Sequence, residues 1–247
     1  MRILGIIPAR FASTRFPGKP LVNINGKSMV RRVYDQALKS NSLRDVIVAT
    51  DDERIFDHVS AFGGQVAMTS PNHKNGTERC GEAINSIDEN FDFVVNIQGD
   101  EPFVSPKQID LICSRLNKDV EMATLMKKVT DHNKFTSANC IKVVFDTSYN
   151  ALYFSRSSIP NFKNSRGDDS FFKHIGVYAY RSDILKRIVL LPPTPLELAE
   201  SLEQLRWLES GYKIKVFETS EESHSIDTPE DLEHLLENFG LQKTMID

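Results

Sequence analysis

Cysteine is scarce in this sequence of 247 residues, and its three cysteines stand far apart. Cys80, Cys113 and Cys140 form no Cys-x-x-Cys pair and have no obvious histidine partner, which argues against a zinc site. Their odd number and isolation also exclude a disulfide framework, because structural disulfides use cysteines in pairs. We therefore expect reduced thiols with a structural role.

Long apolar runs are missing as well. No window approaches the roughly eighteen apolar residues of a membrane-spanning helix, and the N-terminus lacks the apolar stretch and cleavage site of a signal peptide. These features predict a cytoplasmic protein that does not insert into a membrane. The formal net charge of -4 argues against nonspecific nucleic-acid binding and favours a small anionic ligand.

Carboxylates are absent from residues 1–34, although this segment holds seven arginines and lysines. Arg10, Arg15 and Lys19 lie on a loop rich in proline and glycine that follows the apolar run of residues 3–7. Polyphosphates bind through charge-assisted hydrogen bonds from such cations, and neighbouring carboxylates would repel them. The loop is therefore a candidate site for several phosphates.

Gly18-Lys19 invites comparison with the Walker P-loop, in which Gly-Lys follows an earlier glycine and precedes serine or threonine. Here Pro20 follows the lysine and no earlier glycine has the required spacing, so we reject that motif. A phosphate site and a solvated basic loop both remain open on composition. The strand before the loop favours the phosphate site, because ligands of open α/β sheets gather at the carboxyl ends of strands.

The order of apolar and amphipathic segments predicts an α/β fold. Apolar runs typical of strands occupy residues 3–7, 46–49, 65–68 and 93–97. Amphipathic patterns typical of helices occupy residues 29–39, 53–62, 77–86 and 106–117. This alternation predicts a mixed, mostly parallel sheet with helices, in one domain that spans residues 1–247.

The pattern changes in the middle of the chain, where we expect an α+β insertion at about residues 120–195. Its extended runs lie at residues 122–129, 141–145, 151–155 and 174–180. Residues 161–170 are polar and rich in turn formers, which predicts a mobile surface loop able to close over a substrate. The C-terminal part predicts a helix at residues 196–208, a strand at 213–217 and a last helix beginning near Pro229.

Asp100 follows the strand predicted at residues 93–97, at the edge where the sheet should open onto a ligand crevice. Mg²⁺ prefers oxygen ligands, usually one or two carboxylates completed by phosphates and water. A strand-end aspartate beside the permissive Gly99 can supply such a ligand. Aspartate is also common in structural turns after strands, so the position alone leaves both roles open.

Asp227 stands directly before a helix start. Thr228 is the expected N-cap, Pro229 lies in the first turn, and Asp231 completes a capping-box pattern. Because Thr228 can serve the backbone, the Asp227 carboxylate is left to face a cation. The alternative is a second acid that interacts favourably with the helix dipole.

A set of segments spread over nearly the whole chain matches one known family in order. They are IIPARFASTRFPGKPL near the start, VATDDERI from Val48, HKNGTER from His73, VNIQGDEP from Val95, IKVVFD from Ile141, ALYFSRSSIP from Ala151, KHIGVYAYR from Lys173, PLELAESLEQLRWLE from Pro195 and SIDTPEDL from Ser225. In these segments the chain resembles the 3-deoxy-manno-octulosonate cytidylyltransferases, which belong to the nucleotidyltransferases that activate sugars.

The resemblance implies a GT-A-like, Rossmann-related α/β sandwich that acts on CTP and 3-deoxy-D-manno-octulosonate (Kdo) with Mg²⁺. It also implies a homodimer, assembled through the middle region that carries the sugar-binding residues. The implied reaction is an in-line attack of the anomeric hydroxyl of Kdo on the α-phosphorus of CTP. This attack forms CMP-Kdo, a precursor for lipopolysaccharide, and releases pyrophosphate.

The resemblance also implies roles for individual residues. Those matching catalytic positions are Arg10, Arg15 and Lys19 for the triphosphate and Asp100 and Asp227 as magnesium ligands. Further CTP contacts map to Pro8, Ala9, Thr69, Gly76, Arg79 and Gln98, with Thr77 close by. Sugar contacts map to Arg156, His174, Tyr178, Glu203 and Gln204.

Several of these sugar contacts have competing interpretations. Arg156 suits the sugar carboxylate, but His174 lies in an apolar run where a satisfied core histidine is as plausible as a ligand. Tyr178 could fill the same strand face. Residues 161–170 match no segment of the family that we can assign, so contacts from this loop stay open.

Two alternative functions remain open on the sequence. The first is a cytidylyltransferase for a related acid sugar, such as 8-amino-Kdo or a nonulosonate, with the same chemistry. The second is a noncatalytic nucleotide-sensing module, which would need the basic loop but not both distant acids. We see no Cys/His or Ser/His pairing that calls for a covalent enzyme intermediate.

Overall fold

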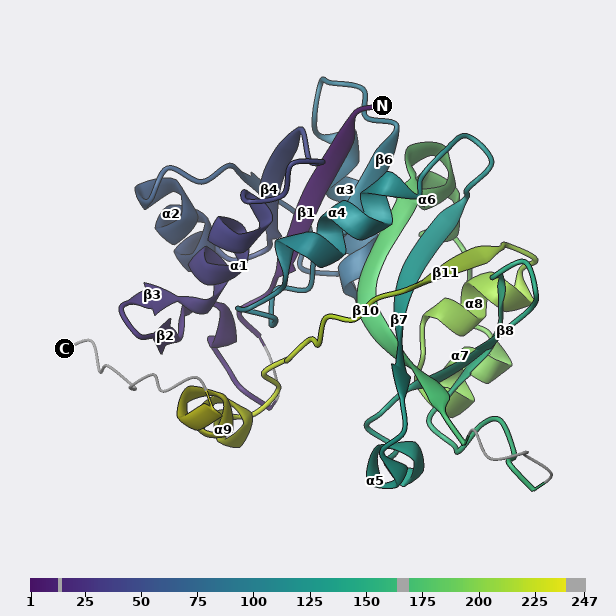
Figure 1. The fold of residues 1–247 in the computed structure, drawn as a ribbon. Coiled ribbons are helices and arrows are strands. Elements are labelled where there is room, and N and C mark those ends of the chain that lie inside the picture. The colour runs from purple at the N-terminus through teal and green to yellow at the C-terminus, as the bar shows by residue number, and fades with distance from the viewer. Residues whose placement is uncertain (13–14, 164–168, 239–247) are drawn as a thin grey trace.

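A nine-stranded sheet runs through the part of the chain that the computed structural model describes, residues 1–12, 15–163 and 169–238 (Figure 1). Its strands are β1 (Ile3–Ala9), β4 (Asp45–Thr50), β5 (Val66–Met68), β6 (Phe93–Asn96), β7 (Met122–Val129), β8 (Lys142–Phe145), β9 (Ala151–Ser155), β10 (Phe171–Arg181) and β11 (Ile214–Glu218). A separate hairpin consists of β2 (Asn23–Ile24) and β3 (Lys27–Ser28).

The main path of the sheet has the order β11-β7-β10-β6-β1-β4-β5, and the β8–β9 pair is attached beside β10. Strand β10 runs antiparallel to β6 and β7, whereas the other pairings along this path are parallel. The predicted α/β class with a mixed, mostly parallel sheet is confirmed.

Helices cover both faces of the sheet. In the described residues they are α1 (Met29–Ala37), α2 (Glu53–Ala61), α3 (Gly76–Asn85), α4 (Pro106–Ser114), α5 (His132–Thr136), α6 (Ser182–Ile188), α7 (Pro195–Glu200), α8 (Gln204–Glu209), α9 (Pro229–Asn238) and the short 3-10 helix η1 (Lys19–Leu21). None of these helices has the length and apolar character needed to cross a lipid bilayer.

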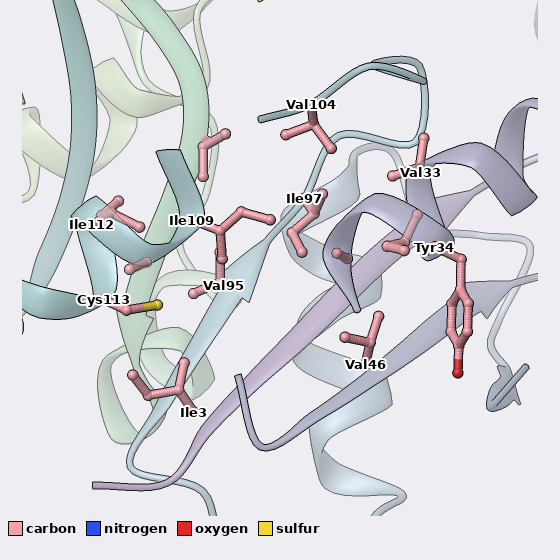
Figure 2. Packing of buried hydrophobic residues seen from close by; sticks show 14 of the residues in the cluster. Ile3, Val33, Tyr34, Val46, Val95, Ile97, Val104, Ile109, Ile112 and Cys113 are labelled. Atoms are coloured by element: carbon pink, nitrogen blue, oxygen red, sulfur yellow. The ribbon is translucent and has the colours of Figure 1, made fainter. Parts of the chain in front are cut away.

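Alternation along the central strand β1 divides the core into two layers. Ile3 and Ile7 pack with residues of α1, α2 and α4 on one face, and Figure 2 shows part of that cluster. Leu4 and Ile6 pack with residues of α3, α6 and α8 on the other face. Because both faces are covered, the strand reads as a continuous apolar run in the sequence.

The three cysteines lie inside these packed regions. Cys113 belongs to the first layer, Cys80 to the second, and Cys140 to a small cluster with Phe135 and Phe171. All three are buried and free, and burial raises the pKa of the Cys113 thiol to about 12. The prediction of reduced structural thiols is confirmed.

A further apolar cluster attaches the C-terminal helix to the N-terminal part of the chain. Leu232, Leu235 and Leu236 of α9 pack with Ile24 of β2 and Met29 at the start of α1. This contact brings residues more than two hundred positions apart in sequence side by side, as the neighbouring α9 and β2–β3 labels show (Figure 1). It also sets the position of the residues that lead into α9.

The structure corrects one expectation. The single helix predicted at residues 196–208 is two helices, α7 and α8, because Ser201 between them has the left-handed φ of 52°. The segment at about 120–195 supplies the main-sheet strands β7 and β10, the β8–β9 pair beside β10, and helices α5 and α6. That this segment is an insertion with sugar-binding and dimerisation elements stays a prediction. Of the predicted loop at 161–170, residues 164–168 lie outside the described part of the chain.

Candidate functional site

A cleft of about 600 Å³ opens where β1 and β6 end. Ten residues predicted for catalysis or CTP binding line it: Pro8, Ala9, Arg10, Arg15, Lys19, Gly76, Arg79, Gln98, Asp100 and Asp227. The structure adds residues that the sequence analysis missed: Pro20, His73, Lys74, Asn75, Gly99 and Ser201. The cleft is thus strongly polar and contains charges of both signs.

One ammonium group joins the two acidic positions. Lys19 Nζ donates to Asp100 Oδ2 at 2.9 Å and to the carbonyl oxygen of Ile226 at 2.8 Å, and it lies 3.5 Å from Asp227 Oδ1. Arg15 Nη2 donates to the same Asp227 oxygen at 3.0 Å. Two carboxylates that are remote in sequence therefore meet beside the cations of the N-terminal loop.

The start of α9 directs the Asp227 carboxylate into the cleft. Asp231 Oδ2 accepts hydrogen bonds from the backbone N–H groups of Asp227 and Thr228, and Thr228 Oγ1 accepts from Asp231 N at 3.2 Å. This reciprocal capping box is the one predicted from the sequence, and it leaves the Asp227 side chain for the cations. The backbone N–H of Ile226 also donates to the carbonyl of Asp100 at 2.9 Å, which couples the two acidic segments directly.

A turn at Gly18 directs Lys19 towards the carboxylates. Gly18 has a φ of 71°, in the left-handed region that favours glycine, and its N–H donates to the carbonyl of Phe11 at 3.0 Å. Lys19 begins η1 immediately afterwards, with Pro20 in the first turn. The prolines and glycine noted in the sequence thus shape a loop that returns its lysine to the sheet edge.

Close backbone packing forms the floor of the cleft. A Cβ atom at Gly99 would lie only 2.5 Å from the carbonyl oxygen of Pro8, and one at Gly76 would lie 3.0 Å from Pro8 Cγ. The ends of β1 and β6 and the start of α3 can approach this closely only because two of the three contact positions lack side chains. The glycine beside Asp100 therefore has a steric reason.

The guanidinium of Arg79 is fixed by Thr69 and Asp51. Its side chain is buried, with Nη1 donating to Thr69 Oγ1 at 2.5 Å and Nη2 lying 3.4 Å from Asp51 Oδ2. Thr69 itself is absent from the cleft lining and supports Arg79 instead. Direct contact of Thr69 with CTP thus stays a prediction.

Glu203 lies next to the cleft. Its Oε2 accepts a hydrogen bond from Thr77 Oγ1 at 2.9 Å, and Thr77 follows the cleft residue Gly76. Burial raises the pKa of Glu203 to about 7, although the bond from Thr77 opposes this shift. Gln204 is buried beside it in sequence, and its Nε2 has no hydrogen-bond partner in the described residues. An orphan amide of this kind suits a polar ligand.

His174 and Tyr178 are buried more deeply than a solvent-facing ligand site requires. His174 Nε2 lies 3.0 Å from Thr124 Oγ1, and its ring packs against Phe154 and Tyr178. Burial lowers the pKa of His174 to about 3, so the imidazole is neutral. These properties match the core-histidine interpretation, and contact of either residue with a sugar stays a prediction.

Arg156 has partners other than a sugar carboxylate. Its Nε donates to the carbonyl of Glu200 at 2.8 Å, Nη1 to that of Ala138 at 3.0 Å, and Nη2 to that of Ser201 at 3.5 Å. Arg156 therefore fixes the junction of α7 and α8, where Ser201 lines the cleft. A direct bond from Arg156 to a sugar stays a prediction.

The residue after Asp100 carries a buried carboxyl group. Glu101 is buried, and burial followed by the charge of Asp100 raises its pKa to about 8. Its Oε2 has no hydrogen-bond partner in the described residues, although Ser223 bonds to the carboxyl group. The sequence placed Glu101 beside Asp100 but gave no sign of burial, because its run of polar neighbours resembles an ordinary surface turn.

We expect Glu203→Gln to change how stability depends on pH. A carboxyl with a raised pKa binds its proton more tightly in the folded state, so its contribution to stability falls as pH rises from about 4.5 to above 7. Gln cannot ionise, so the free energy of unfolding of the variant should gain about 3 kcal/mol relative to the unchanged protein over this range. Denaturant titrations at pH 4.5, 6 and 8 measure this difference.

Glu200→Gln is the matched control. Burial alone would raise the pKa of Glu200, but hydrogen bonds from Ser155, the backbone of Arg156 and Tyr153 outweigh it and lower the pKa. The control should therefore lose stability relative to the unchanged protein as pH rises through the range in which carboxyls titrate. Parallel pH profiles for Glu203→Gln and the unchanged protein would contradict the raised pKa.

Known proteins share this sequence and fold. Residues 4–215 match the family described as Cytidylyltransferase. The 3-deoxy-manno-octulosonate cytidylyltransferases of Bacteroides thetaiotaomicron and Cytophaga hutchinsonii are 53% and 52% identical to the chain. Those alignments cover 95% and 93% of this chain and 96% and 94% of the relatives.

Solved structures give the same result. A CMP:2-keto-3-deoxy-manno-octonic acid synthetase complexed with CTP has a TM-score of 0.91 and 38% identity, over 97% of this chain and 99% of that one. The 4-diphosphocytidyl-2C-methyl-D-erythritol synthase of Anaerococcus prevotii shares the fold with a TM-score of 0.63 at 14% identity, over 97% and 98% of the two chains. The chain thus belongs to the cytidylyltransferase family, among the 3-deoxy-manno-octulosonate cytidylyltransferases.

Proposed function

We propose that this protein transfers CMP from CTP to Kdo, forming CMP-Kdo and pyrophosphate. One observation carries the proposal: Arg15, Lys19, Asp100 and Asp227 converge in a cleft at the carboxyl ends of β1 and β6. The similar synthetase whose structure contains CTP supports the nucleotide, and the names of the closely related proteins support the sugar. Transfer of a nucleotidyl group needs both the cations and the acids.

The two carboxylates fit a divalent cation. The Lys19 ammonium contacts one oxygen of Asp100 and reaches within 3.5 Å of one oxygen of Asp227, so a single small cation can touch both residues. Hard oxygen ligands of this kind suit Mg²⁺. When bound, the ion would neutralise charge and polarise phosphate oxygens at the reacting phosphorus.

The cations of the N-terminal loop have the task of holding the triphosphate. Arg10 and Arg15 are exposed at the cleft, so their guanidinium groups can meet phosphate oxygens without breaking buried contacts. Lys19 is mostly buried and supplies a fixed ammonium on the cleft floor. These groups orient the α-phosphorus towards the sugar and stabilise the charge that leaves on pyrophosphate.

The sugar-binding side lies towards α7, α8 and β10. The α7–α8 junction contains Ser201, Glu203 and Gln204, and Arg156 holds it through carbonyl contacts. We propose that this junction binds Kdo and presents its anomeric hydroxyl for in-line attack. On the family resemblance, we also propose a homodimer formed through the middle region and a cytoplasmic role in supplying activated Kdo for lipopolysaccharide.

A pyrophosphate-release assay tests the function. With CTP and Mg²⁺, Kdo should trigger release, while 8-amino-Kdo and a nonulosonate should be poorer substrates. Asp227→Asn keeps the side-chain size and the backbone capping bonds, so it should fold and yet lose on the order of a hundredfold in rate. Faster turnover with another acid sugar would reassign the substrate, and CTP binding without release would favour a nucleotide sensor.

Lys19→Met should change the affinities for metal and for nucleotide in opposite directions. The Lys19 ammonium contacts the proposed metal ligands and therefore competes with a divalent ion in the nucleotide-free protein. Without it, Mn²⁺ should bind the nucleotide-free protein about three- to tenfold more tightly, whereas CTP should bind about tenfold more weakly. Electron paramagnetic resonance of free Mn²⁺ and calorimetry with CTP measure the two affinities.

Lys27→Met is the control for that experiment. Lys27 pairs with Asp35 at 2.5 Å in the same N-terminal region but does not line the cleft. Its replacement should leave both affinities unchanged. If Lys19→Met bound Mn²⁺ no more tightly than the unchanged protein, competition between the ammonium and the metal would be excluded.

A further inference from the structure

The segment of residues 219–228, called here the linker, carries Asp227 from β11 to α9. Figure 1 shows it as an olive-yellow trace that crosses in front of β7 and β10. Asp100 follows β6 after three residues and is placed by the sheet, whereas Asp227 lies on a segment without helix or strand structure. The contacts that fix the linker therefore decide whether the two carboxylates meet.

Backbone hydrogen bonds hold the linker at two points. At its start, Thr219 N donates to the carbonyl of Met126 in β7 at 2.8 Å. Near its end, Ile226 N donates to the carbonyl of Asp100 at 2.9 Å. Side chains provide further anchors between these points, including the bond from Ser105 Oγ to Glu221 Oε2 at 3.0 Å.

Another of these anchors places a carboxylate between two lysines of the sheet. Lys127 of β7 and Lys173 of β10 stand directly opposite each other in the antiparallel register. Like charges in directly opposed positions destabilise a strand pair. The carboxylate of Glu222 lies between them, accepting from Lys173 Nζ at 2.7 Å and from Lys127 Nζ at 3.1 Å.

A third cation and the ionisation of Glu222 strengthen the anchor. Lys134 Nζ of α5 lies 3.8 Å from Glu222 Oε2. Burial would raise the pKa of Glu222, but the hydrogen bonds and charges of Lys173 and Lys127 outweigh it and lower the pKa to about 2. The carboxylate therefore stays ionised at neutral pH, and the linker residue that follows, Ser223, bonds to Glu101 beside Asp100.

We infer that Glu222, clamped by Lys127 and Lys173, is a positioning residue that sets the linker so that Asp227 meets Asp100. The inference rests on the proposed function, because it gives the acidic pair its metal-binding task. Glu222 touches neither of the acids. It acts by fixing the linker to β7 and β10, and β10 pairs directly with β6, the strand that leads to Asp100.

Binding of Mn²⁺ in the presence of CTP tests this role in the full-length chain. Glu222→Gln keeps the side-chain shape but removes the charge, so the opposed lysines repel each other and the linker is released. Removing a group that orients metal ligands commonly costs ten- to a hundredfold in metal affinity, and we expect a loss on the order of tenfold. Electron paramagnetic resonance of free Mn²⁺ measures the affinity, and circular dichroism checks the fold.

Asp183→Asn is the matched control. It removes the ion pair between Arg181 and Asp183. Arg181 is the last residue of β10, whereas Lys173 lies near the start of this strand. This variant should bind Mn²⁺ with unchanged affinity even where its thermal stability falls. A folded Glu222→Gln protein with unchanged Mn²⁺ affinity would overturn the inference.

A charge exchange covers the case in which Glu222→Gln does not fold. In the double variant Lys127→Glu with Glu222→Lys, the new carboxylate faces Lys173 across the strands and can pair with the new ammonium. We expect this variant to recover most of the Mn²⁺ affinity, and a folded double variant with weak binding would contradict the positioning role. If the unchanged protein bound CTP but failed to bind Mn²⁺, that result would instead overturn the metal assignment on which the inference rests.

Discussion

The candidate site depends on one charge arrangement, in which the Lys19 ammonium bridges Asp100 and Asp227 at the edge of the sheet. Two like-charged carboxylates would repel each other if they were brought this close without a cation between them. The ammonium makes their approach possible in the nucleotide-free protein. The same geometry prepares the acids for a divalent ion and the lysine for a phosphate.

Three parts of the fold meet to create this arrangement. The sheet places Asp100 after β6, the turn at Gly18 returns Lys19 to the sheet edge, and the packing of α9 on the β2–β3 hairpin brings in Asp227. None of the three elements forms the site alone. The apolar cluster beneath α9 therefore matters for chemistry as well as for stability, because it fixes the end of the linker.

Much of this could be predicted from the sequence. Continuous apolar runs identified the buried strands, and the capping pattern at residues 228–231 correctly left the Asp227 side chain free for cations. The absence of acids before residue 35 identified the basic loop. These signals are local, because they depend on neighbouring residues and on the regular periods of helices and strands.

Other features depended on contacts that no local pattern records. The helical spacing of residues 196–208 gave no sign of the left-handed Ser201, which divides α7 from α8. Arg156 looked like a ligand for a carboxylate, yet its guanidinium donates to backbone carbonyls of the α7–α8 junction and of Ala138. The pairing of Lys127 and Lys173 with Glu222 depends on strand register and on the course of a distant linker.

The most direct measurement is anomalous diffraction from crystals of the protein grown with CTP and Mn²⁺. The account predicts a manganese peak within coordination distance of carboxylate oxygens from both Asp100 and Asp227, with the Lys19 ammonium on the triphosphate. A peak that contacts only one of the two residues, or lies away from both, would contradict the convergence on which the site depends.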